Sequence, residues 1–160
     1  MTRPFFALLA ALTVAPVCLS AQDSVAVRGH RVMGFDQELT RHHFLLYDDG
    51  GAIDVRVKDP ADRQNLGAVR AHLGHLPTMF GAGNFSMPMG VHAREVPGTA
   101  RMAELRDRIR YRYVETELGG RVDIVTSDRA ALAAVHDFLR FQIADHETGD
   151  DTVVRARPGR

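Results

Sequence analysis

Residues 42–59 of the chain read HHFLLYDDGGAIDVRVKD, and residues 111–128 read YRYVETELGGRVDIVTSD. The two stretches align at an offset of 69 on their Gly-Gly pairs, their short apolar runs and their closing aspartates. The stretches that follow align at an offset of 66, because the first copy holds three extra residues. The chain therefore contains an internal repeat, over residues 42–80 and 111–146, and this repeat decides the fold.

Each copy of the repeat predicts a β-hairpin followed by a helix. Ile53, Val55 and Val57 alternate with charged residues, which is the pattern of a strand with one buried face. The Gly-Gly pair is typical of a tight turn that needs positive φ. Asp59 is expected to cap the first helix and Pro77 to kink or end it. The predicted buried stripes of the two helices are Leu66, Val69, Leu73, Leu76 and Phe80 in the first, and Leu132, Val135, Leu139 and Ile143 in the second.

Two such units in tandem predict an α+β fold. We expect a four-stranded antiparallel sheet with the two main helices on one face, because hairpins pair locally and need no crossover. The single domain spans residues 41–149, and residues 81–108 connect the repeats as a Gly-, Met- and Pro-rich loop that ends in a short helix. Residues 22–40 are predicted to be loosely ordered, and residues 150–160 to form a flexible tail.

The first 21 residues have the layout of a secretory signal peptide. Arg3 precedes an apolar run from Phe5 to Val17, and cleavage is expected near Ala21. Thirteen apolar residues are too few to span a bilayer, which needs about 20. The pattern predicts a periplasmic or secreted protein with no membrane contact after cleavage. Cys18 lies where a lipid could be attached, and the pattern leaves that alternative open.

Composition excludes several classes of chemistry. Cys18 is the only cysteine, so the mature chain would have no disulfide, thiolate nucleophile or Cys-ligated metal. Twenty Lys and Arg balance 20 Asp and Glu, whereas a nucleic-acid-binding protein normally shows a basic excess. There is also no phosphate-binding loop, no Gly-x-Ser-x-Gly elbow and no zinc-protease helix motif. No catalytic residue is assigned, and the sequence favours a protein that is not an enzyme.

Histidine and methionine are the candidate ligands. The chain has eight His, and five of its six Met follow the predicted signal peptide. Imidazole and thioether without thiolate form a ligand set that suits copper. One group is His72, His75 and Met79 along the first predicted helix, which could equally be a solvated flank. A second group is Met87, Met89 and His92 in the connector, where methionines also commonly fill gaps beneath a loop.

The third group follows from comparing the two repeats. At the hairpin offset His42 aligns with Tyr111, and at the helix offset His146 aligns with Phe80. Both histidines are therefore expected to face the core, where an imidazole must be hydrogen-bonded or bound to a metal. They could share an ion if the start of the strand meets the end of the helix, and His92 could close the site. The alternative is that both are ordinary histidines bonded to a carboxylate or a carbonyl.

Two functions remain from the sequence. The first is an exported binding protein for a transition metal, copper before zinc, using His and Met ligands. The second is a non-catalytic interaction module that presents its exposed sheet face or the connector to a protein partner or to a second copy of itself. The charged side chains expected on that sheet face are Asp54, Arg56, Lys58, Arg110, Arg112 and Asp123.

Four segments form a pattern that reaches beyond the repeat. They are Met33-Gly34-Phe35-Asp36-Gln37, Thr40-x-His42-His43-Phe44, Gly119-Gly120-Arg121-Val122 and His136-x-Phe138-Leu139-Arg140-Phe141-Gln142-Ile143-x-x-His146-x-Thr148-Gly149-Asp150. With these segments, over residues 33 to about 150, the chain resembles a group of small exported bacterial proteins of unknown role. The resemblance implies a single exported domain and assigns no catalytic residue.

Overall fold

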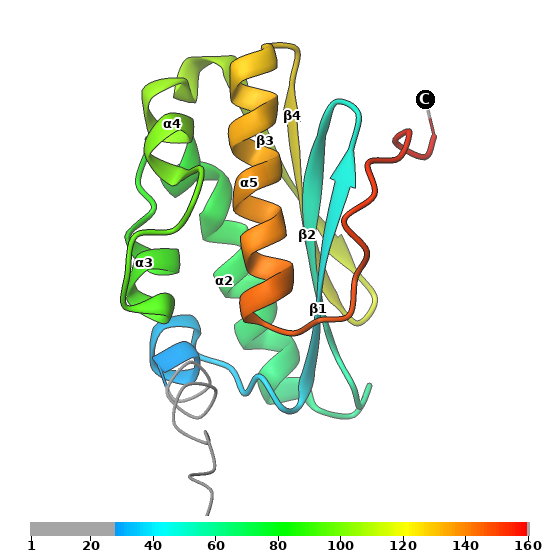
Figure 1. Ribbon diagram of the computed structural model, residues 1–160. Helices are drawn as coiled ribbons and strands as arrows, with labels where there is room; N and C mark the ends of the chain where they lie inside the picture. The colour runs from blue at the N-terminus through cyan, green and yellow to red at the C-terminus, as the bar shows by residue number, and fades with distance from the viewer. Residues whose placement is uncertain (1–27, 160) are drawn as a thin grey trace, which may run out of the picture.

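The structure, a computed structural model, describes residues 28–159. Two β-hairpins, each followed by a long helix, form a four-stranded antiparallel sheet with both helices on one face (Figure 1), so the predicted α+β fold is confirmed. The elements are β1 (Thr40–Tyr47), β2 (Gly50–Val57), α2 (Arg63–Gly81), α3 (Ser86–His92), α4 (Thr99–Glu104), a 3-10 turn (Arg106–Arg108), β3 (Ile109–Thr116), β4 (Gly119–Thr126) and α5 (Arg129–Asp145). The predicted signal peptide lies outside the described residues. Within residues 28–159, no helix has the length and apolarity needed to cross a membrane.

The two repeats are related by a pseudo-twofold axis through the centre of the sheet. The strand order is β1-β2-β4-β3, so the second strands of the two hairpins pair with each other. In this pairing Ile53 lies opposite Val122, and these two residues are equivalent positions of the repeat. Two residues that are equivalent in the repeat and also paired in antiparallel strands are related by a twofold axis that passes between them.

Each long helix covers the hairpin of the other repeat. Helix α2 packs mainly over β3 and β4, whereas α5 packs mainly over β1 and β2. The predicted buried stripe of α2 is confirmed in full, and in α5 only Leu132 is half-buried and not fully buried. We call this arrangement the exchange of helices. Because of it, each half of the core is formed by the hairpin of one repeat and the helix of the other.

The Gly-Gly pairs serve close approach more than turn geometry. The turn residues are Asp48-Asp49 and Glu117-Leu118, and the glycines begin the strands that follow. A Cβ on Gly51 would lie 2.2 Å from Leu139 Cδ1 of α5, and a Cβ on the equivalent Gly120 would lie 3.2 Å from Leu73 Cδ1 of α2. The expectation of a positive-φ turn is met only at Gly50, whose φ is 142°. The second glycine of each pair makes room for the helix of the other repeat.

Gly119 gives a direct test of this close packing. A Cβ at this position would lie 2.0 Å from the carbonyl oxygen of Val55 in the neighbouring strand. We expect Gly119→Ala to lower the free energy of unfolding by about 2–3 kcal/mol, because two central strands must move apart. The matched control is Gly67→Ala in α2, where nothing lies within 4 Å of the new Cβ. That substitution should raise stability by about 0.5–1 kcal/mol through helix propensity, and urea unfolding of both variants measures the contrast.

The first helix begins three residues later than expected. Asp62, and not Asp59, caps α2 by accepting a hydrogen bond from the backbone N–H of Asn65 at 3.0 Å. Asp59 instead closes the preceding turn by accepting from the N–H of Ala61. These turn residues are the three extra residues of the first copy, so Asp62 is the true equivalent of Asp128, which caps α5. The helix also continues through Pro77 and ends at Gly81.

Segments outside the repeat are more ordered than the sequence indicated. Residues 28–33 are helical, and Phe35 is 1% exposed in the core. The Met- and Pro-rich part of the connector is not a loop but the helix α3, and α4 supplies the expected short helix with Met102 fully buried. Residues 150–159, expected to be a flexible tail, lie against the outer edge of β1, because Asp150, Arg155 and Arg157 bond to the sheet.

Candidate functional site

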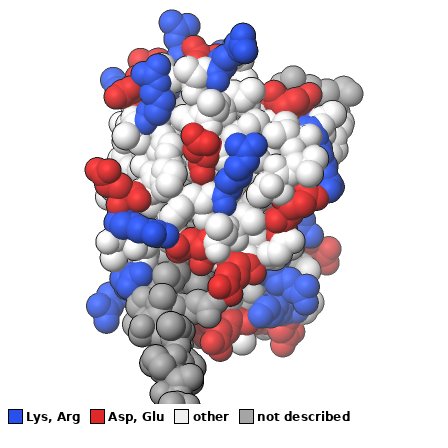
Figure 2. Space-filling model, viewed as in Figure 1, with Lys and Arg blue, Asp and Glu red and all other residues white. Residues whose placement is uncertain are grey.

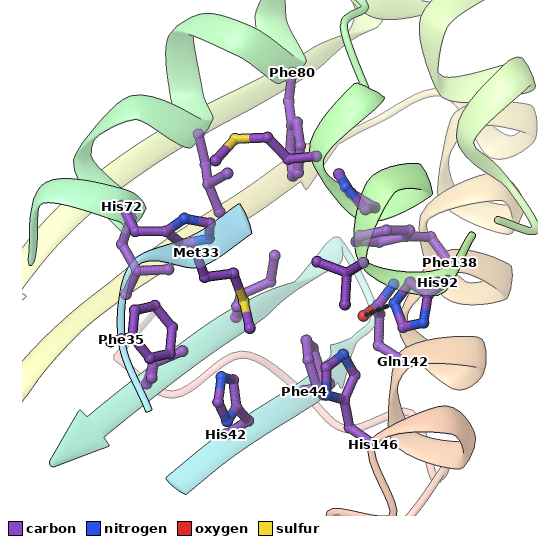
Figure 3. Close-up of a pocket in the computed structure, with 17 residues that line it drawn as sticks. Met33, Phe35, His42, Phe44, His72, Phe80, His92, Phe138, Gln142 and His146 are labelled. Atoms are coloured by element: carbon purple, nitrogen blue, oxygen red, sulfur yellow. Dashed lines mark hydrogen bonds between the residues drawn. The ribbon is translucent and has the colours of Figure 1, made fainter. Parts of the chain in front are cut away.

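A cavity of about 60 Å³ lies between the sheet, α2, α3, α5 and the segment around Met33 (Figure 3). Its wall is almost entirely apolar, apart from four imidazoles and one amide. The lining residues are Met33, Phe35, His42, Phe44, Ile53, Val55, His72, Leu73, Leu76, Phe80, Met87, Pro88, Val91, His92, Phe138, Gln142 and His146. Half of the histidines in the chain therefore converge on one cavity.

His42 and His146 are in contact. Their rings are nearly parallel, at an interplanar angle of 19° with centroids 5.5 Å apart. They meet because α5 covers the hairpin that carries His42. In the other half of the molecule the equivalent residues, Tyr111 and Phe80, also meet, with centroids 5.7 Å apart in an edge-on arrangement. One pair of aromatic rings in the core has thus been exchanged for a pair of imidazoles at the cavity.

Two further imidazoles complete the group. The His92 ring lies 5.1 Å from that of His146. His72 is separated from His42 by Phe35, whose ring stacks on His42 at 5.7 Å and meets His72 edge-on at 5.5 Å. The Met33 side chain enters the cavity between these rings (Figure 3).

Burial keeps three of these histidines uncharged at neutral pH. Burial, together with the neighbouring His146, His72 and His43, lowers the pKa of His42 to about 3. Burial likewise lowers the pKa of His72 and of His146 to about 4, aided by His75 and by His92 respectively. The neutral imidazole is the form that binds metals. Nε2 of His42 is buried and has no hydrogen-bond partner among residues 28–159, so within this part of the chain its lone pair or proton is unused.

His92 is held by a carboxylate. Its Nδ1 lies 2.6 Å from Oδ2 of Asp145, whose other oxygen accepts a hydrogen bond from Arg94 at 2.6 Å. Its Nε2 faces Oε1 of Gln142 at 3.2 Å, while the amide nitrogen of Gln142 is buried without a partner. A carboxylate on Nδ1 fixes the ring orientation and directs Nε2 toward the cavity. Asp145 therefore partners His92, and not His146.

The remaining predicted ligands do not form a single group. His72 lines the cavity, whereas His75 is exposed and Met79 packs against the core, so the line along α2 is divided. Met87 lines the cavity, but Met89 on the same helix points outward and is 39% exposed.

Met33 and Phe35 were not predicted to line the site, because they precede the repeat and carry no periodic signal. The available indication was that Met33-Gly34-Phe35 belongs to the pattern that reaches beyond the repeat.

Two other histidines have structural roles. Nε2 of His136 lies 2.9 Å from the carbonyl oxygen of Tyr47 and 3.0 Å from that of Gly50, and so joins α5 to the first hairpin. His43 faces away from the cavity and bonds to Asp150 at 2.9 Å.

Comparison with known proteins assigns no family: no protein-family model, curated protein or solved structure matches the chain. Among residues 28–159, no group of three or more His, Cys, Asp or Glu side chains is placed so that it could hold a metal ion. Any function must therefore be argued from the cavity itself.

Proposed function

We propose that the cavity binds a monovalent copper ion, with His42 and His146 as its imidazole ligands and Met33 as a thioether ligand. The observation that supports this proposal is the contact between two uncharged imidazoles at positions where the other half of the molecule has a packed aromatic pair. Thioether and imidazole are ligands that copper accepts, and thioether selects the monovalent ion. Copper(I) also accepts two or three ligands, so it does not need a group of three His or carboxylate side chains.

Charge favours a monovalent ion over zinc. In the part of the chain that the structure describes, no carboxylate lines the cavity, and the nearby Asp145 is already bonded to His92 and Arg94. A divalent ion among neutral ligands in an apolar cavity would keep two uncompensated charges, and burying charge is costly. Zinc in structural sites also takes four ligands in a tetrahedron. Zinc is thus the weaker candidate.

Size favours an ion over an organic ligand. Pockets for organic ligands usually measure about 300–1,000 Å³, whereas this cavity measures about 60 Å³. An ion needs only a rotation of the ligand side chains. His146 is the C-cap residue of α5. Binding would require its stacked ring to rotate so that a ring nitrogen points toward His42. Because a signal peptide is predicted for residues 1–21, we propose that the protein performs this function in the periplasm or outside the cell.

The test is an anaerobic copper(I) titration of residues 22–160 against a chromophoric copper(I) chelator. We expect one ion per chain, and an affinity at least about 100-fold lower in the variant His42→Phe/His146→Phe, which corresponds to two lost ligands. Met33→Leu should weaken binding by about 10-fold. His75→Ala removes an exposed histidine of α2 and is the matched control, with unchanged affinity. Binding no tighter than micromolar, or binding that survives loss of both histidines, would contradict the proposal.

A second candidate function, an interaction module, is supported by the outer face of the sheet. The face formed by α3, α4 and α5 carries charges of both signs (Figure 2). The outer sheet face instead presents exposed guanidinium groups, with the side chain of Arg112 75% exposed and Arg110 exposed beside it. An acidic protein partner, or a second copy, would fit this face. Arg110→Glu/Arg112→Glu should then abolish oligomers or complexes seen by native mass spectrometry, and oligomers that persist in this variant would contradict the idea.

A further inference from the structure

The segment after α5 runs along the outer edge of the sheet as a partial fifth strand. Arg155 forms a parallel bridge with Tyr47: its N–H donates to the carbonyl oxygen of Leu46, and its carbonyl oxygen accepts from the N–H of Asp48 at 2.9 Å. Earlier in the segment, the Asp150 carboxylate accepts from the N–H of Phe44 at 2.9 Å. The free edge of β1 is therefore covered by residues of the same chain.

Arg157 ends this segment in a site that uses all three of its guanidinium nitrogens. Nε contacts both carboxylate oxygens of Asp49 at 2.9 and 3.0 Å, and Nη1 donates to Asp123 at 3.0 Å. Nη2 donates to the carbonyl oxygens of Gly51 and Ile124 at 3.1 and 2.9 Å. The guanidinium also lies 4.5 Å above the ring of Tyr47, and the Arg157 side chain is only 12% exposed. Such a planar set of acceptors matches arginine and not lysine.

We propose that the β1 edge and this guanidinium site together bind an extended, arginine-bearing peptide segment of a partner protein, and that residues 150–157 occupy the site as an intramolecular substitute. Addition of a strand to a sheet edge is a general mode of peptide recognition, in which backbone hydrogen bonds give affinity and side-chain pockets give specificity. Here Leu46 and Asp48 supply the backbone contacts, and Asp49, Asp123 and Tyr47 supply the pocket.

The way the segment is attached supports displacement. It is held at its two ends, whereas Val153 between them is 62% exposed. It is joined to α5 through Gly149, at φ 75° with open space around it, which suits a hinge. Tethering gives the intramolecular segment a high effective concentration, so a competing peptide binds well only when the tether's own contacts are weakened. Exchange of one arginine for another would also preserve the ion pairs that Arg157 makes with Asp49 and Asp123, which an apolar peptide could not do.

The experiment uses the full chain with both anchors weakened, Asp150→Ala/Arg157→Ala, and a fluorescein-labelled peptide of residues 150–158. Fluorescence anisotropy should show binding to this variant at least about 10-fold tighter than to the wild type, because the substitute no longer competes. A peptide with lysine in place of Arg157 should bind at least about 10-fold more weakly than the parent peptide. Equal affinity of the two peptides, or equal binding to variant and wild type, would overturn the proposal.

Amide exchange of the wild-type protein provides a measurement that does not depend on the folding of a variant. The N–H of Asp48 bonds to the segment and not to the sheet. If the segment detaches as a unit, this amide should exchange at least about 100-fold faster than the amides that join β2 to β4. Exchange at the same rate would show that the segment opens only with the whole domain and is not a displaceable ligand. Both measurements are independent of copper binding.

Discussion

Acidification from pH 7 to pH 5 is expected to lower the free energy of unfolding by about 4–6 kcal/mol, a large part of the stability of a typical domain. The cause is the set of buried imidazoles whose pKa values burial lowers to about 3 in His42 and about 4 in His72 and His146. In the unfolded chain these groups titrate near their ordinary pKa of about 6.5. Their contribution to stability is therefore complete above pH 6.5, and it is lost as the pH falls toward the pKa values of the folded state.

The magnitude follows from proton linkage. At pH 5 each unfolded histidine holds about one more proton than its folded counterpart, which costs about 2 kcal/mol per group. Urea unfolding at pH 5, 6, 7 and 8 measures this loss, and the slope between pH 6 and pH 5 should correspond to uptake of nearly three protons. The exposed His30 provides the control, since His30→Gln should leave the slope unchanged. A stability that is flat over this range would contradict the neutral, buried state of the three rings.

Replacement of His42 and His146 by phenylalanine is expected to stabilise the protein while it removes the proposed site. The double variant restores the type of contact that Tyr111 and Phe80 make in the other half. At pH 7 we expect the free energy of unfolding to rise by about 1–3 kcal/mol, because none of the described residues supplies a hydrogen-bond partner for the buried Nε2 of His42. At pH 5 the gain over the wild type should grow by about 4 kcal/mol, because two proton-linked groups are gone. Thermal and urea unfolding at both pH values measure the difference.

The reciprocal substitution is the control for this result. Phe80 is 1% exposed and packs against Phe85, Phe138 and Tyr111. Phe80→His removes part of this packed aromatic cluster and places a smaller polar ring at the wall of the same cavity. We expect it to lower the free energy of unfolding by about 3–5 kcal/mol. If Phe80→His did not lower the stability, the two equivalent positions would tolerate histidine equally well. The idea that only the half of the core with His42 and His146 is adapted to imidazole would then be wrong.

The fold could be predicted from sequence patterns because the hairpin and helix patterns occur in both copies of the repeat. The stripe of α2 carried over to the structure without change. The strand alternation did so only in part, because Asp54 and Asp123, expected on the exposed sheet face, are buried at 2% and 6% exposed. Arginine side chains pair with both carboxylates and cover them.

The helix start was misplaced because both Asp59 and Asp62 are residues that cap helices well. The hydrogen bond to Asn65 identifies Asp62 as the cap, in agreement with its alignment with Asp128 at the helix offset of 66. The Gly-Gly pairs were predicted to form the turns, but they mainly allow close packing. A sequence does not show that a Cβ on Gly51 would lie 2.2 Å from Leu139 of α5.

The candidate site was predicted in part. Comparison of the repeats placed His42 and His146 inward, and their contact arises from the exchange of helices, which no local pattern shows. The predicted ligand group His72, His75 and Met79 did not form. Helical spacing shows that these residues lie near one another on the helix surface, but it does not show which of them are buried. Met33 came from a segment without periodicity, and its placement depends on packing against α3 and the sheet.

The exchange of helices across the pseudo-twofold axis suggests how the cavity with His42 and His146 could arise in only one half of the core. Because each long helix packs mainly over the hairpin of the other repeat, a chain with a single repeat would reproduce this packing as a symmetric homodimer. Such a homodimer would carry two identical sites, and a residue change that opened one would open the other. Gene duplication and fusion remove that constraint. One half of this protein keeps the aromatic pair that stabilises the core, while the other half is free to hold histidines at the equivalent place.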